Sequence, residues 1–299
     1  MGFDHQDAVE EGGLPGGDVA PRGPVGGDTV YRHRRSTRIW HWLNALTVFV
    51  MLMSGLMIFN AHPALYWGRY GANHETPWLS IGGDQQKGYV QIGKVRIPTT
   101  GVLGHWRDKN GNIRTNAFPS WATIPSSYDL AGARQWHFFF AWLLVLPGLA
   151  YWGWSAFDRH LQRDLAPRRS ELAPRHIWRD IKDHARLRYP TGAEARDYNI
   201  LQKLAYLGIL FALLPLMVLT GLTMSPGIDA AWPWLLDLFG GRQSARSIHF
   251  IVAMLIIGFI LVHLIQVVLA GPVNEIRSMI TGRYRLPKEK GRLPKEKGT

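Results

Sequence analysis

The sequence predicts an all-α integral membrane protein: a bundle of four transmembrane helices with a small cap that contains some β-structure. Three observations lead to this prediction. Four apolar stretches are each long enough to cross a bilayer, which takes about 20 helical residues. Lys and Arg are concentrated in alternate links between these stretches. The link between the first two stretches, 61–135, is too long for a simple connector and carries strand patterns.

The four spans are expected at 39–59, 136–157, 200–224 and 247–270. Three of them contain no charged residue, and the only charge of the third, Lys203, lies near one end, where its side chain could snorkel to the interface. Buried helices of a soluble bundle would show a polar face, and these show only single His, Asn and Gln residues. Membrane lipid is therefore the expected surrounding of all four.

The flanking charges set the orientation. The 158–199 link carries ten Lys and Arg in 42 residues, and the tail after Ala270 carries eight in 29. By contrast, 61–135 carries eight in 75 residues, and 225–245 has only Arg242. Both termini are therefore expected in the cytoplasm, with the cap on the opposite face of the membrane.

Three parts are expected along the chain. Residues 1–30 are rich in Gly, Pro and Asp and predict a disordered cytoplasmic arm. Residues 31–283 form the four-helix domain, and 284–299 form a charged cytoplasmic tail. Within the cap, strand-like runs at 88–92 and 94–97 and an Asn110-Gly111 hairpin signal predict β-structure.

Composition restricts the chemistry. The net charge of +12 would suggest nucleic acid, but a membrane surface attracts basic segments equally well, and no nucleic-acid partner is predicted. The chain has no Cys, which excludes cysteine-ligated iron–sulfur clusters, covalently attached c-type haem, disulfides and thiol nucleophiles. Any redox or metal chemistry must use the 12 His or the carboxylates. No catalytic residue is assigned.

Four of the histidines lie in the spans. His249 and His263 are 14 residues apart on one helix, about 21 Å along its axis, and leave the same face. The predicted topology puts His41 at the depth of His263, and His137 at the depth of His249. The topology is derived from Lys and Arg in the links, without the histidines, so the match in depth of the two pairs is an independent check on it. Intramembrane ionisable residues are costly and usually functional.

Two His facing each other across a bundle suit a b-type haem with both axial positions filled, so the sequence predicts two haem b groups. Zinc would need three or four ligands at one depth, and the spans lack the carboxylates to complete such a site. Haem propionates need cations near the interface, and Arg38, Arg134 and Arg246 each stand three residues before a ligand candidate, one turn nearer water. Ordinary capping of a membrane helix by Arg is the alternative. Gly55, 14 residues after His41, would leave room for a macrocycle at the other depth, although small residues are common at membrane helix contacts.

With these features the chain resembles the diheme cytochrome b membrane subunits of formate dehydrogenase-N and Ni,Fe-hydrogenases, in the bacterial cytochrome b-561 family. The resemblance covers roughly residues 32–283, and its matching features are Arg38-Ile39-Trp40-His41-Trp42, His137 and His249-x13-His263. It implies that His41 and His263 hold a cytoplasmic-side haem and that His137 and His249 hold a periplasmic-side haem, in a bacterial inner membrane. The cap and the N-terminal arm are longer than a minimal member would need.

The resemblance also implies the function: transmembrane electron transfer between the quinone pool and a periplasmic redox subunit, a molybdoenzyme or a hydrogenase, with the chain as the respiratory-chain subunit. Two alternatives stay open. A stand-alone quinone-linked haem oxidoreductase, such as a superoxide oxidase, would turn over without a partner. A haem-free transporter or membrane scaffold would bind no haem.

Overall fold

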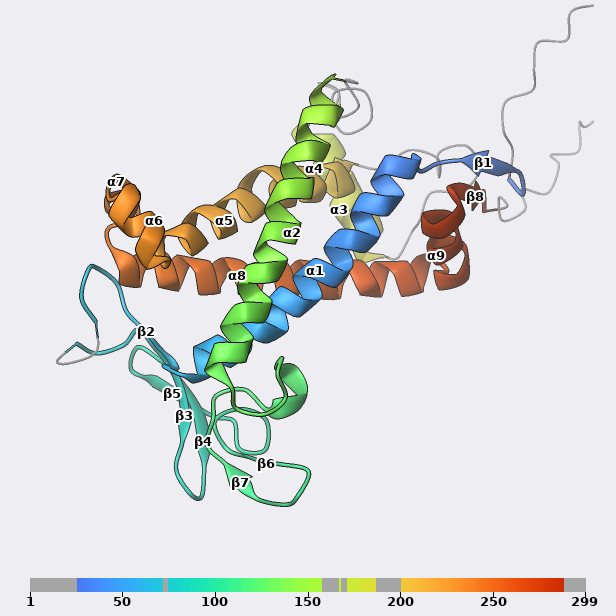
Figure 1. Cartoon of the computed structure of the whole chain (residues 1–299). Coiled ribbons are helices and arrows are strands. Elements are labelled where there is room, and N and C mark those ends of the chain that lie inside the picture. Colours follow the sequence, from blue (N-terminus) through green and yellow to red (C-terminus); the bar gives the residue numbers. More distant parts are fainter. Residues whose placement is uncertain (1–25, 72–74, 158–166, 168–170, 187–199, 288–299) are drawn as a thin grey trace, which may run out of the picture.

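The computed structural model describes residues 26–71, 75–157, 167, 171–186 and 200–287. Four spans within these residues are long and apolar enough to cross a membrane, and the predicted helical membrane bundle is confirmed. They are α1 (Arg35–Asn60), α2 (Leu130–Phe157), the continuous run of α4 and α5 (Ile200–Thr223) and α8 (Arg242–Ala270) (Figure 1). Most of the predicted arm (1–30), of the predicted tail (284–299) and of the basic 158–199 link lie outside the described residues.

Three of these helices begin before the apolar stretches that predicted them. α1, α2 and α8 start at Arg35, Leu130 and Arg242, four to six residues earlier than expected. Polar residues next to a span can continue its helix, because hydropathy marks the hydrocarbon core and not the helix end. The start of α2 is fixed by Asp129, whose side chain accepts the N–H of Gly132 at 2.9 Å.

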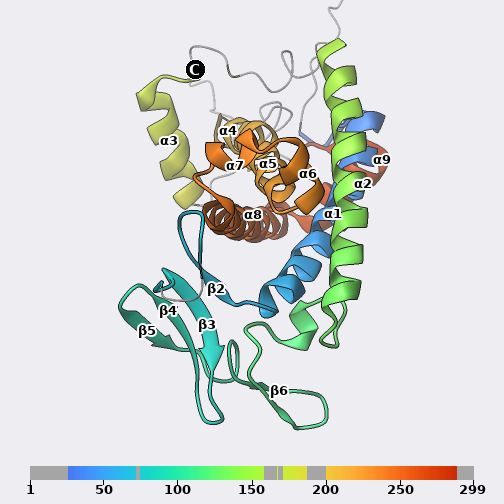
Figure 2. The same ribbon diagram turned by 60° about the vertical axis from the view of Figure 1, so that its left-hand side comes forward.

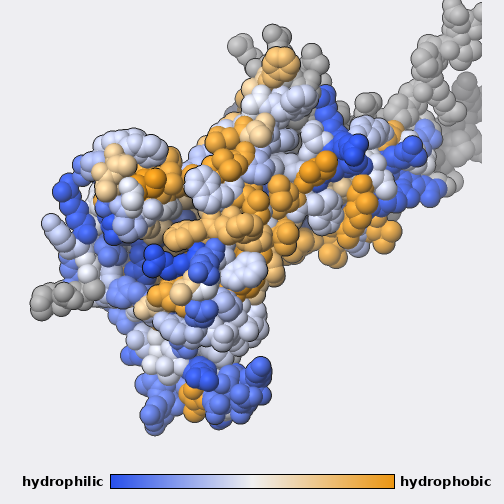
Figure 3. Space-filling model, viewed as in Figure 1, coloured by the Kyte–Doolittle hydropathy of each residue, from blue (hydrophilic) through white to orange (hydrophobic). Residues whose placement is uncertain are grey.

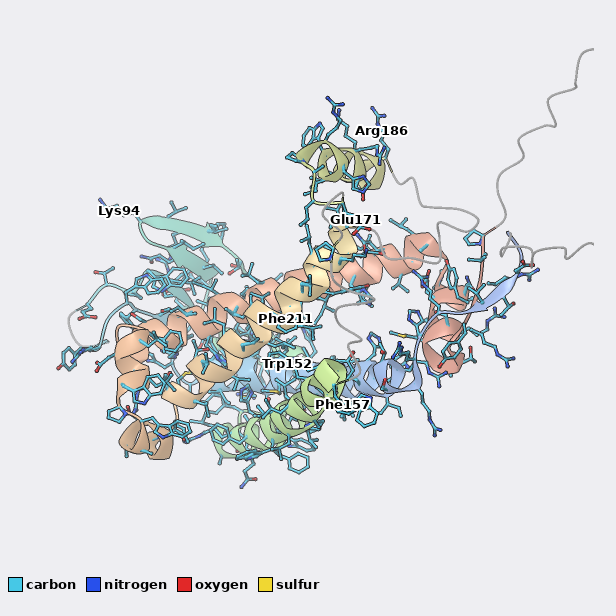
Figure 4. The ribbon with its side chains drawn as sticks, turned by 90° about the horizontal axis from the view of Figure 1, so that it is seen from above. Lys94, Trp152, Phe157, Glu171, Arg186 and Phe211 are labelled. Atoms are coloured by element: carbon cyan, nitrogen blue, oxygen red, sulfur yellow. The ribbon has the colours of Figure 1, made fainter. Side chains whose placement is uncertain are left out.

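The third span is helical throughout but irregular at its centre. α4 (Ile200–Gly208) and α5 (Leu214–Thr223) are joined by a π-helical segment, Ile209–Leu213. Pro215 stands two residues after this segment and has no backbone N–H for the usual helical bond, so the wider turn accommodates it. Phe211 in the π-helical segment stacks on Trp152 of α2 with ring centres 5.2 Å apart (Figure 4).

The spans pack as two pairs, α1 with α2 and α5 with α8. Large apolar side chains cover the outside of all four, and Figure 3 shows them as an orange band across the helices. Hydrophilic surface gathers beyond the band, over the cap and near the start of α1. This distribution is what a lipid-facing bundle requires, since only its polar ends meet water.

The cap is a small β-structure between α1 and α2. Four antiparallel strands form one sheet in the order β2 (Ala64–Leu65), β3 (Leu79–Gly83), β4 (Gly88–Ile92) and β5 (Val95–Pro98). β6 (Trp106–Arg107) and β7 (Ile113–Arg114) form a hairpin around Asn110-Gly111, and a 3₁₀ turn, Ser120–Ala122, follows. The predicted strands and hairpin are confirmed. The cap ends at Asp129 instead of 135, because α2 begins earlier than its apolar stretch.

The cap is fixed to one end of the bundle (Figure 2). Its apolar core, around Leu65, Leu79 and Ile81, includes Phe59 of α1, which stacks on Phe250 of α8 at 4.7 Å. Hydroxyls near the start of α8 bind the cap as well: Ser247 donates to the carbonyl of Tyr66, and Ser244 accepts the N–H of Gly68. We call this the cap end of the bundle.

The opposite end carries both termini, and we call it the termini end. β1 (Thr29–Tyr31) pairs antiparallel with β8 (Arg283–Arg285), which follows α9 (Pro272–Thr281). Tyr284 and Leu286 are buried against Val30. The expected boundaries of the arm and the tail, at 30/31 and 283/284, fall inside this sheet. A pairing between residues more than 250 positions apart leaves no local sequence signal.

Short helices complete the described part of the chain. α3 (Pro174–Ala185) packs beside the start of α4. α6 (Pro226–Ala231) and α7 (Trp234–Leu238) connect α5 to α8 at the cap end. The sequence between α5 and α8 suggests one interfacial helix, and the break falls at Pro233, which ends the first helix because its ring restricts the preceding residue.

Candidate functional site

The structure brings the four intramembrane histidines together as two pairs. His41 of α1 faces His263 of α8 with ring centres 6.3 Å apart and ring planes at 66°. His137 of α2 faces His249 of α8, also at 6.3 Å, with ring planes at 59°. One face of α8 thus serves both pairs, as the 14-residue spacing predicts. The first pair lies toward the termini end and the second toward the cap end.

The ring separation fits a metal ion bound between the two imidazoles of each pair. With a bond of about 2.0–2.1 Å from metal to nitrogen and each ring centre about 1.1 Å behind that nitrogen, two opposed rings have centres about 6.3 Å apart. Among the described residues no group of three or more His, Cys, Asp or Glu side chains could hold a metal ion. A zinc site therefore lacks its ligands among these residues, whereas two histidines would suffice to hold a haem iron.

At the cap end, a hydroxyl from a neighbouring helix contacts each imidazole. Ser54 Oγ of α1 lies 3.1 Å from Nδ1 of His137, and Thr220 Oγ1 of α5 lies 3.0 Å from Nδ1 of His249. The carbonyl of Met51 lies 3.1 Å from Nδ1 of His137 as well.

These contacts determine which ring nitrogen carries the proton. Ser54 Oγ donates to the carbonyl of Val50 at 2.8 Å, and Thr220 Oγ1 donates to the carbonyl of Leu216 at 2.6 Å. A hydroxyl whose single hydrogen points to a carbonyl accepts from the imidazole, and the carbonyl of Met51, which can only accept, requires the same N–H at Nδ1 of His137. Nδ1 is therefore the N–H donor in both rings, which leaves the lone pair of Nε2 for a metal ion.

A glycine follows each of these hydroxyl residues. A methyl group added at Gly55 would lie 3.4 Å from Cε1 of His137, and one added at Gly221 would lie 3.5 Å from Cε1 of His249. Gly55 lies at the predicted depth, but its nearest neighbour is the imidazole ring itself. The lack of a side chain lets the ring approach the helix backbone closely.

Sequence reasoning missed Ser54 and Thr220, although a signal was present. The segments Met51-Leu-Met-Ser-Gly55 and Met217-Val-Leu-Thr-Gly221 share the pattern Met-x-x-Ser/Thr-Gly. The partner helices share Ala-Arg-x-x-His-Phe, at 133–138 and 245–250. The helix pairs α1–α2 and α5–α8 thus repeat the same arrangement around the cap-end histidines.

The termini-end pair has different surroundings. Neither ring nitrogen of His41 or of His263 has a hydrogen-bond partner among the described residues. Phe259 stacks on His263 with ring centres 5.9 Å apart, and Trp42 meets His41 edge-on. On α1 beyond His41, Asn44 Oδ1 and Thr47 Oγ1 are buried and find no partner in the part of the chain that the structure describes.

The three predicted arginines lie near the ends of their helices, with different partners. Arg38 donates to the carbonyl of Ile280 in α9 at 2.9 Å. Arg246 donates to the carbonyls of Ala64, at 2.9 Å, and His62, and so joins α8 to the cap. Arg134 is exposed, and its guanidinium lies 5.8 Å from the ring centre of Phe138.

Two titratable side chains near the ends of the bundle are buried. Lys203 does not snorkel: it is buried, and its Nζ donates to both carboxylate oxygens of Glu171 at 2.9 Å. His33, before α1, is buried as well. Burial, with the positive charge of Arg32, lowers the pKa of His33 to about 4.

Comparison with known proteins places the chain in a family. The sequence profile of prokaryotic cytochrome b561 matches residues 32–282, and the chain belongs to this family. Membership implies b-type haem and electron transfer within a multi-pass membrane protein, as the sequence predicts.

Two curated relatives are similar along most of their length. A protein of Azospira oryzae, provisionally named subunit YedZ1 of a protein-methionine-sulfoxide reductase, is 28% identical over 232 residues, which is 78% of this chain and 87% of the relative. Cytochrome YdhU of Escherichia coli K12, also a provisional name, is 25% identical over 266 residues, or 87% and 76% of the two chains. No solved structure matches the chain.

Proposed function

We propose that the chain transfers electrons across the membrane between the quinone pool and a redox subunit on the cap side, with two b haems as its cofactors. His41 and His263 hold one haem, and His137 and His249 hold the other. The observation that carries this proposal is the equal 6.3 Å separation of two histidine pairs at two levels of one helix. Haem supplies reversible one-electron oxidation and reduction of its iron when it is bound.

The side chains around the histidines prepare them for this role. The hydroxyls of Ser54 and Thr220 fix the cap-end rings as Nδ1–H tautomers, so both present Nε2 to the iron. Each pair would give its haem iron two histidine ligands, and such a haem would serve as an electron relay and not as a catalytic centre for a small oxidant. Arg38 and Arg246 lie near enough to the bundle ends to pair with propionates if they exchange their present carbonyl partners.

The orientation follows from the distribution of Lys and Arg. Both termini face the cytoplasm, and the cap faces the periplasm of a bacterial inner membrane. The cap-end pair is then the periplasmic one. Because the relative YedZ1 is named as a subunit of a protein-methionine-sulfoxide reductase, we infer that this chain also serves a periplasmic redox subunit.

We place the quinone at the termini end, beside His41 and His263. Asn44 Oδ1 is a buried acceptor without a partner among the described residues and suits the hydroxyl of a quinol. Lys203, whose charge is paired with Glu171, is less suited to that role. Asn44→Leu should therefore slow quinol oxidation while the haem spectrum stays unchanged.

A reduced-minus-oxidised spectrum with haem quantitation tests the proposal. The purified chain should contain two b haems, and a preparation without a Soret band would overturn the proposal in favour of a haem-free transporter or scaffold. Copurification with a periplasmic subunit is expected. A purified chain that oxidises quinol or reduces quinone at full rate alone would instead support the stand-alone oxidoreductase.

A further inference from the structure

The two cap-end hydroxyls have the same geometry on two different helices. Ser54 and Thr220 each donate a hydrogen bond to the carbonyl four residues earlier and each meet Nδ1 of a histidine at about 3 Å. Both side chains are fully buried. Water therefore does not reach their remaining lone pairs, and the imidazole N–H is the donor that occupies them.

A purely structural role of the two hydroxyls would explain their hydrogen bonds to the backbone carbonyls but not their contacts with the imidazoles. Ser and Thr in membrane helices commonly donate to the carbonyl four residues back, and that bond alone satisfies the hydroxyl hydrogen. It does not require the oxygen to face an imidazole. The repetition of Met-x-x-Ser/Thr-Gly opposite each cap-end histidine, with a glycine that lets the ring approach, points to a contact shaped for the ring.

An acceptor at Nδ1 changes the ligand as well as its position. When Nδ1–H donates a hydrogen bond, electron density at Nε2 increases, and the imidazole becomes a stronger donor to the metal. A stronger donor stabilises the ferric over the ferrous state and lowers the midpoint potential. The termini-end rings lack such an acceptor in the described part of the chain, so this effect belongs to one haem site.

We propose that Ser54 and Thr220 are positioning residues of the cap-end haem site: their hydroxyls fix the planes of His137 and His249 and keep the midpoint potential of that haem lower than it would otherwise be. This inference rests on the proposed ligation of haem by the two histidine pairs. It attributes the difference between the two haem sites to Ser54 and Thr220, which are not themselves haem ligands.

The test is a potentiometric titration of the full-length purified protein with optical and EPR detection. Ser54→Ala and Thr220→Val should each raise the midpoint potential of one haem and change its ferric g-values, while the other haem is unaffected. The shift in Ser54→Ala should be the smaller one, because the carbonyl of Met51 remains an acceptor for Nδ1 of His137. The double variant should show the larger shift. Thr223→Val removes a buried hydroxyl of α5 that donates to the carbonyl of Thr220 and forms no hydrogen bond with a histidine of the described chain, so it should leave both haems unchanged. Ser54→Thr and Thr220→Ser keep the acceptor and should retain the wild-type potential.

The remaining outcomes separate a failure of this inference from a failure of the proposed function. If the double variant keeps both haems with unchanged potentials and g-values, the inference is wrong even though the proposed function stands. If the wild type binds no haem, the proposed function fails first. Should Ser54→Ala fail to fold, Ser54→Cys keeps the side-chain volume with a weaker acceptor, and an unchanged potential in that variant would also overturn the inference.

Discussion

At the cap end of the bundle, His137 and His249 donate hydrogen bonds to buried hydroxyls of neighbouring helices. At the termini end, His41 and His263 are held by aromatic contacts, and buried oxygens nearby have no partner in the described chain. The ring separation is nevertheless the same in both pairs. The comparison teaches that ligand spacing is set by the helix backbones, whereas the chemistry of each site is set by side chains that differ between the two ends.

The largest effect should come from removing one ligand of each pair. His249→Ala is expected to remove the cap-end haem and His263→Ala the termini-end haem, so the haem-to-protein ratio falls from two to one in each variant. Haem quantitation and redox titration measure this. His105→Ala, in the cap, is the control and should keep both haems. Loss of both haems in either ligand variant would show that the two sites are not separable.

The next effect comes from filling the space beside the cap-end rings. Gly55→Leu should displace the imidazole of His137 and remove the cap-end haem, since even a methyl group there would already be in contact with Cε1. Gly55→Ala should be close to wild type. Gly208 has no atom within 4 Å of an added methyl group, so Gly208→Leu should keep both haems. Equal haem loss in Gly208→Leu would contradict a role specific to Gly55.

A smaller effect is expected from the ion pair near the termini end. Lys203→Met removes the cation that pairs with Glu171 in this structure and should destabilise the fold by about 3 kcal/mol, the lower edge of the range for a buried pair, because Glu171 keeps 22% of its side-chain surface exposed. Thermal unfolding in detergent measures the change. Lys203→Met with Glu171→Gln should recover part of the loss, and equal stability of the single and double variants would argue against this pair.

The smallest effect is a pH dependence of the termini end. The pKa of His33 is lowered to about 4 by burial and by Arg32, from an unfolded value near 6.5. Between these values the unfolded chain binds the proton and the folded chain does not. The contribution of His33 to the free energy of unfolding is therefore fully present above about pH 6.5. It is lost as the pH falls through about 4, and the loss is at most roughly 3 kcal/mol.

Hydrogen exchange of the β1–β8 strands at pH 7 and pH 4.5 checks this. Exchange should speed up at the lower pH in the wild type, and His33→Gln should show a flatter pH dependence. An equally steep dependence in His33→Gln would assign the effect to another group.

Much of the candidate site could be predicted from sequence because it depends on helical geometry. The 14-residue spacing of His249 and His263 fixes their common face, and the charge distribution fixes which ends meet, so His41 and His137 follow. Ser54 and Thr220 could not be assigned in this way. A hydroxyl in an apolar helix is usually satisfied by its own backbone, and only the packing of α1 on α2 and of α5 on α8 shows that these two also face histidines.

The sequence by itself determined the four spans, the β-structure of the cap and the two levels of histidine, because hydropathy and helical periodicity are local properties of the chain. The tertiary structure alone decided three features: the pairing of β1 with β8, the ion pair of Lys203 with Glu171 in place of the snorkelling that the sequence suggests, and the different hydrogen bonding of the two histidine pairs. Each joins residues that are distant along the chain, and such contacts arise only when helices and strands pack in space.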